Sequence, residues 1–166
     1  MPSRKSSNPL EELFTETLKD IYFAEKQILR ALPKMAKEAK SPDLKEAFET
    51  HRDETENQVE RLNQIFESMG RPARGKTCDA ILGIIDEAKA VMDQFKGEEA
   101  LDAGLTASAQ TVEHYEIARY GALKSWALQL GFDDAAKLLD QTLQEEIKTD
   151  KLLSDLAMKS LNKEAA

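Results

Sequence analysis

Four long stretches of this chain carry apolar residues three or four positions apart, and acidic residues interrupt each stretch near its middle. This spacing places side chains on one face of an α-helix, the face that a bundle buries. The first stretch runs through Phe14, Leu18, Ile21, Glu25, Ile28, Leu32 and Met35. A buried carboxylate is costly unless it is protonated, hydrated, paired with a cation or bound to metal. The pattern therefore predicts a helical core that must accommodate acid.

Capping residues and glycines indicate where the helices begin and end. Asn8 before Pro9 and Ser41 before Pro42 are N-cap signatures, and Gly131 is a helix stop. Pro33 predicts a kink or break near residues 29–33. The expected helices span about 9–40, 42–69, 79–95, 98–130 and 133–161.

The lengths of the connections predict the topology. Short links near residues 41 and 131 indicate two antiparallel hairpins, and residues 70–97 form a long crossover that carries the short helix. This is the connectivity of an all-α, ferritin-like antiparallel four-helix bundle. We expect a disordered tail at 1–8, one domain at 9–161 and a flexible end at 162–166.

Charge and cysteine content narrow the function classes. The net charge is −8 and the one N-terminal basic cluster is Arg4 and Lys5, so nucleic acid is not an expected partner. No apolar run reaches the roughly 18 residues of a membrane span, and no signal peptide is recognisable. A single cysteine, Cys78, excludes an intrachain disulfide or a cysteine zinc site. These features favour a soluble cytoplasmic protein.

The interrupting acids fall at compatible heights on the four long helices. If the hairpins are antiparallel, they converge halfway along the bundle. Carboxylate oxygens suit hard ions such as iron or manganese. Six ionised carboxylates carry a total charge of −6, whereas two Fe²⁺ ions supply +4 and two Fe³⁺ ions supply +6. An oxidised iron pair would therefore balance the charge of all six. The candidate metal ligands are Glu25, Glu54, Glu113, Glu116, Glu146 and Asp150, with His51 and Gln58 as further candidates.

A purely structural role, without metal, remains open for each of these residues. A single mid-helix glutamate is commonly a surface residue, and His51 is more often a hydrogen-bonded interior histidine than a ligand. Tyr22 and Tyr120 are most simply core residues. The coincidence of acid in four helices is what favours a site.

Several segments carry a resemblance to a known family. The runs DIYFAEKQILRALPKMAKEA, HRDETENQVERL, AQTVEHYEIARYGALKSWALQLG and TLQEEIKTDKLLSDLA resemble the bacterial YciF-like stress-protein family of the ferritin-like superfamily. The similarity covers nearly the whole chain. It implies a ferritin-like bundle, a homodimer and an association with bacterial stress responses.

The resemblance also implies roles for individual acids. Ferritin-like di-iron proteins use one Glu from each of two helices and a Glu-x-x-His from each of the other two. Glu25, Glu54, Glu113 and Glu146 match the four acids, and the Glu113–Glu116 pair resembles rubrerythrins. Asn57 and Thr149 stand where the histidines are expected, so Gln58, His51 and Asp150 are substitute ligands.

The sequence leaves two functions open. The first is a dinuclear iron or manganese protein that handles oxygen or peroxide during stress, whether or not it is an enzyme. The second is a non-catalytic dimeric scaffold or interaction module with a degenerate metal site. Catalytic residues are not identifiable, and no organic cofactor is expected.

Overall fold

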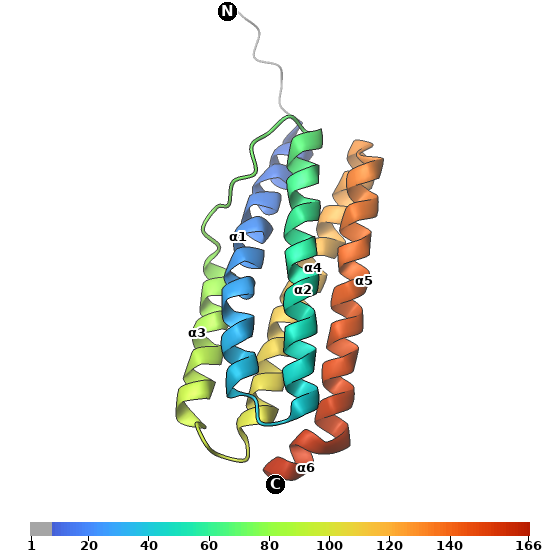
Figure 1. Cartoon of the computed structure of the whole chain (residues 1–166). Coiled ribbons are helices and arrows are strands. Elements are labelled where there is room, and N and C mark those ends of the chain that lie inside the picture. Colours follow the sequence, from blue (N-terminus) through green and yellow to red (C-terminus); the bar gives the residue numbers. More distant parts are fainter. Residues whose placement is uncertain (1–7) are drawn as a thin grey trace, which may run out of the picture.

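The computed structural model describes residues 8–166, which form an all-α bundle (Figure 1). The four long helices are α1 (Pro9–Glu38), α2 (Pro42–Ser68), α4 (Leu101–Leu130) and α5 (Asp133–Leu156). The shorter α3 (Asp79–Gln94) lies in the crossover and packs on α1 and α4. Two hairpins, α1–α2 and α4–α5, joined by this crossover confirm the ferritin-like connectivity.

Local chemistry explains the helix boundaries. The Asn8 side chain accepts a hydrogen bond from the backbone N–H of Leu10 at 3.0 Å, and Ser41 Oγ accepts one from Leu44 N at 3.4 Å. Gly131 ends α4 at φ +76°, a left-handed conformation that favours glycine. The predicted boundaries near these residues agree with the structure to within two or three positions.

Pro33 does not break α1, which runs as one helix from Pro9 to Glu38. Of the two predicted outcomes, a kink or a break, the break is therefore wrong. Pro33 is exposed, so water can take the place of the backbone donor that the proline lacks.

The C-terminal end also differs from expectation. Instead of one helix to Leu161, α5 ends at Leu156, a π-helical segment covers Ala157–Leu161, and α6 covers Asn162–Ala165. The chain turns beneath the bundle here (Figure 1) and Leu161 is buried. The expected flexible end at 162–166 thus carries a short helix, and the expected tail at 1–8 lies outside the described residues except for Asn8.

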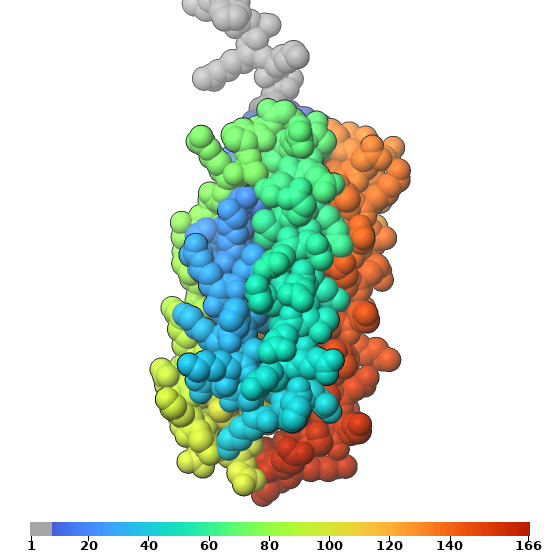
Figure 2. Space-filling view, viewed as in Figure 1, coloured from blue at the N-terminus to red at the C-terminus, as the bar shows by residue number. Residues whose placement is uncertain are grey.

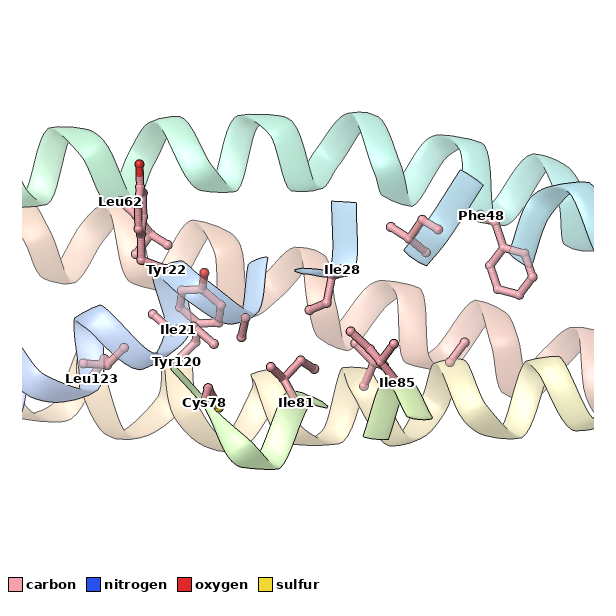
Figure 3. Packing of buried hydrophobic residues seen from close by; sticks show 14 of the residues in the cluster. Ile21, Tyr22, Ile28, Phe48, Leu62, Cys78, Ile81, Ile85, Tyr120 and Leu123 are labelled. Carbon is pink, nitrogen blue, oxygen red and sulfur yellow. The ribbon is translucent and has the colours of Figure 1, made fainter. Parts of the chain in front are cut away.

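The apolar core extends along the bundle and under the crossover. Figure 3 shows Cys78, Ile81 and Ile85 gathered with Ile21 of α1 and Tyr120 of α4, all in one buried cluster. Halfway along the bundle, polar residues replace the apolar ones. Buried positions of α2 between Phe48 and Leu62 are His51, Thr55 and Gln58, and those of α5 between Leu139 and Leu153 are Thr142, Glu146 and Thr149. This polar layer is where the candidate site lies.

Candidate metal centre

Five titratable side chains from all four long helices meet in the polar layer. Ligand atoms of His51, Glu113, Glu116 and Glu146 lie within 4.8 Å of one another, and Glu25 lies beside Glu116. None of the five is more than 3% exposed. We call Glu25, His51, Glu113, Glu116 and Glu146 the core cluster.

The contacts of His51 resemble those between ligands of a common ion. Its Nε2 lies 2.8 Å from Glu113 Oε1 and 3.9 Å from Glu146 Oε2. Neither ring nitrogen makes a hydrogen bond of good geometry, although both are buried. Neighbouring ligands of an octahedral ion with bonds of about 2.1 Å lie about 3 Å apart. The close approach therefore fits two groups facing one ion as well as it fits an ion pair.

Unpartnered oxygens concentrate in the same place. Within residues 8–166, the buried side-chain atoms that lack a hydrogen-bond partner are Glu25 Oε2, His51 Nδ1 and Nε2, Gln58 Oε1, Glu113 Oε2, both oxygens of Glu116, and Glu146 Oε2. Buried polar atoms are normally satisfied, and such a concentration requires an explanation. Carboxylate oxygens with one imidazole are a donor set that iron and manganese accept.

Burial and mutual repulsion alter the protonation of these groups. Burial, reinforced by the charge of Glu146, raises the pKa of Glu25 to about 8. Burial and neighbouring carboxylates raise the pKa of Glu116 and Glu146 well above the ordinary value. Burial lowers the pKa of His51, but contact with Glu113, Glu54 and Glu146 outweighs it and raises the pKa well above 6.5. In the absence of metal, protons therefore compensate the acids.

Neighbouring side chains hold two of the carboxylates in place. The Tyr120 hydroxyl donates to Glu25, and the Gln58 amide donates to Glu146 and, at 3.0 Å, to Glu145. The Arg61 guanidinium donates two hydrogen bonds to the Glu145 carboxylate, at 2.6 Å from Nη2 and 2.8 Å from Nη1, and a third from Nη1 to Thr142 Oγ1 at 3.1 Å. These hydrogen bonds orient the acids without occupying all their oxygens.

The structure gathers some of the sequence candidates and separates others. Glu25, Glu113, Glu116, Glu146 and His51 form the core cluster, and Gln58 contacts it. Glu54 lies at its rim, with a side chain 25% exposed and Oε2 3.9 Å from His51 Nδ1.

Asp150 lies elsewhere, between α5 and α4. Its carboxylate is 3.1 Å from His114 and accepts from Gln110 at 3.4 Å. The Arg61–Glu145 pair was not anticipated. The sequence feature that could have indicated this pair is the position of Arg61, three residues after Gln58 on the same helix face.

No helix within residues 8–166 combines the length and apolar character that a membrane crossing requires.

Comparisons with known proteins place these observations in a family. Residues 9–166 match the family described as Domain of unknown function (DUF892). The chain is 46% identical over 157 residues to Protein YciF of Escherichia coli (strain K12), covering 94% of this chain and 95% of that protein.

Solved structures agree with this. The crystal structure of the E. coli stress protein YciF matches with TM-score 0.88 and 44% identity, over 98% of this chain and 99% of that one. YcfI from Rhodopseudomonas palustris matches with TM-score 0.86 and 42% identity, over 92% and 97%. A Xanthomonas campestris protein at 23% identity and TM-score 0.73, over 95% and 96%, shares the fold.

Proposed function

The chain belongs to the DUF892 family, and we propose that it is a stress-response protein that holds a dinuclear iron or manganese centre in its bundle core. The observation that carries this proposal is the set of buried, unpartnered carboxylate oxygens on Glu25, Glu113, Glu116 and Glu146. Four carboxylates carry −4, and two divalent ions supply +4 when His51 is neutral. Metal binding would thus replace protons and leave the core without net charge.

The core cluster suggests how its residues would share the ions. The carboxylates of Glu25, Glu113, Glu116 and Glu146 and the imidazole of His51 would together hold the ions. Iron or manganese would supply a change of oxidation state on reaction with oxygen or peroxide. The chain's own contribution is to exclude water, to hold Glu25 through Tyr120 and to hold Glu146 through Gln58.

Metal stoichiometry tests this proposal. After anaerobic loading with Fe(II) or Mn(II) and desalting, elemental analysis should give about two ions per chain. Glu25→Ala and Glu146→Ala should lower this value, whereas Asp150→Asn, outside the core cluster, should leave it unchanged. Equal metal content in the wild type and both alanine variants would contradict the assignment.

A second candidate function is a non-catalytic scaffold. It is favoured by the hydrogen bonds from Tyr120 to Glu25 and from Gln58 to Glu146, which partly satisfy the acids without metal. A scaffold should retain almost no ion in the loading experiment, and neither metal should raise its melting temperature. Two retained ions with a raised melting temperature would exclude a degenerate site.

We propose that the working form is a cytoplasmic homodimer. Such an interface would cover exposed apolar side chains of α4 and α5, where Leu128, Ile147 and Leu152 are each 44–55% exposed. Sedimentation equilibrium should give twice the chain mass of 18.6 kDa. Ile147→Glu with Leu152→Glu should shift the mass to that of a monomer, while a double change at exposed Lys37 and Lys45 should not.

A further inference from the structure

The core cluster is closed to solvent, so an ion needs a way to reach it. All five members are at most 3% exposed. Most of the surrounding core is apolar, and an ion stripped of water cannot cross it cheaply. Any path inward must therefore be lined by polar side chains.

The interface between α2 and α5 is polar over nearly three turns of α2 at the height of the core cluster. Contacts across it join Glu54 to Thr149, His51 to Glu146, Gln58 to Glu146, and Arg61 to Glu145. The two helices adjoin on one face of the molecule (Figure 2). At one end of this interface Arg61 and Gln58 both donate to Glu145, and Gln58 also donates to Glu146, so these donors are already engaged.

The other end of the interface presents Glu54. Its side chain is 25% exposed, whereas those of the core cluster are buried. Its Oε2 accepts from Thr149 Oγ1 at 3.4 Å and lies 3.9 Å from His51 Nδ1. The other nitrogen of the same ring, Nε2, faces Glu113 and Glu146 inside. His51 therefore separates the partly exposed carboxylate from the buried ones.

We propose that Glu54 is the access carboxylate of the metal centre: it captures a divalent cation at the α2–α5 surface and passes it by way of His51 to the core cluster. This inference rests on the proposed function. In the proposal Glu54 is a transient ligand whose carboxylate speeds loading, and the resident ligands are the five members of the core cluster. Thr149 orients the Glu54 carboxylate, and the positive charge of the exposed Lys148 nearby limits how strongly it retains a cation.

Uptake kinetics test the proposal with Co(II) as a coloured probe. Metal-free full-length protein is mixed with Co(II) in a stopped-flow instrument, and the visible absorption of bound Co(II) gives the rate and the endpoint. Glu54→Gln, which keeps shape and removes charge, should slow uptake at least tenfold. It should leave the number of ions bound and the final spectrum unchanged. Release to EDTA should slow by a similar factor, because the same path serves both directions.

Asp150→Asn is the matched control. The Asp150 side chain, on α5, is 22% exposed, close to the 25% of Glu54 on α2, but its contacts are with His114 and Gln110. It should load at the wild-type rate. An unchanged rate in Glu54→Gln would overturn the proposal, and so would a lower endpoint, since Glu54 would then be a resident ligand. A wild-type protein that takes up no Co(II), Fe(II) or Mn(II) would instead refute the proposed function and this inference with it.

Discussion

At the scale of single residues, the site depends on which polar atoms have partners. Tyr120 is fully buried and its hydroxyl donates to Glu25 Oε1, while Glu25 Oε2 has no partner. The phenol therefore fixes one oxygen of the carboxylate and leaves the other for a ligand. Burial and the adjacent acids raise the pKa of Tyr120 well above 10, so the hydroxyl remains a donor throughout the working pH range.

Tyr120→Phe should weaken metal binding by about 10–100-fold, the usual effect of losing a group that orients a ligand. It should also destabilise the metal-free protein by about 1–3 kcal/mol, because Glu25 loses its donor in a buried setting. Metal titration and urea unfolding measure the two effects. Tyr22→Phe is the control, since the Tyr22 hydroxyl makes no hydrogen bond within residues 8–166 and its ring packs edge-on against Phe66. Equal behaviour of the two variants would contradict the role given to Tyr120.

The sequence could predict that acids lie in the core, but it could not decide between neighbouring positions on one helix. His51, Glu54 and Gln58 are separated by one turn each, and a small rotation of α2 determines which of them faces inward. In the structure His51 and Gln58 are buried and Glu54 lies at the rim. Asp150, one turn from Glu146, faces α4 instead. The rotation of α2 and of α5 about its own axis depends on apolar packing along the whole helix. No local sequence motif indicates it.

At the scale of helices, the α1–α2 turn is tied to the start of α4 by one buried acid. Asp102 accepts hydrogen bonds from the backbone N–H groups of Lys40 and Ser41 at 2.9 and 2.7 Å. The Lys40 side chain returns to the carbonyls of Gly97 and Glu98 at 2.8 and 3.0 Å. These contacts join the two hairpins at the end of the bundle away from the α4–α5 turn.

Asp102→Ala should lower the free energy of unfolding by about 2–3 kcal/mol, since two partly buried backbone donors lose a charged acceptor. Metal stoichiometry should stay at the wild-type value, because the change lies outside the core cluster. Asp43→Ala, at an exposed first-turn position of α2, should cost less than about 1 kcal/mol. Thermal and urea unfolding check both variants. If Asp102→Ala leaves the free energy of unfolding unchanged, the Lys40 side chain alone is enough to hold the α1–α2 turn.

The helices were more predictable than the site because their signals are local. Asn8 and Ser41 act through side-chain hydrogen bonds to the first turn of their own helix, and the following prolines and Gly131 act through backbone geometry. These signals identify helix ends without knowledge of the fold. The break predicted at Pro33 does not occur, because the effect of a proline inside a helix depends on its surroundings and Pro33 is exposed. The π-helical segment after Leu156 carries no sequence signal either; burial of Leu161 under the bundle accompanies it.

At the scale of the whole molecule, the raised carboxyl pKa values make folding and metal binding respond to pH in opposite directions. Glu25 titrates near 4.5 when unfolded and near 8 when folded. Below about 4.5 both states are protonated and its contribution to stability is complete. Between these values the native state holds more protons, so stability falls as pH rises, by at most about 1.4 kcal/mol per unit and per group. Glu116, Glu146 and His51 act in the same direction.

We therefore expect the metal-free protein, in EDTA, to unfold at lower urea concentration at about pH 8 than at about pH 5.5. The surface acids Glu16 and Asp140 have lowered pKa values and lose stabilising charge only at more acidic pH, so they do not reverse this trend.

Saturating Mn(II) should cancel or reverse the trend, because the ion displaces protons from the core cluster and binds more tightly as pH rises. Glu25→Gln should flatten the metal-free dependence. The prediction is contradicted if the stability of the metal-free protein is constant or increases over this pH range, since water would then already reach the buried acids. The carboxylates of the core cluster would in that case not repel one another strongly enough to require two divalent ions for charge compensation.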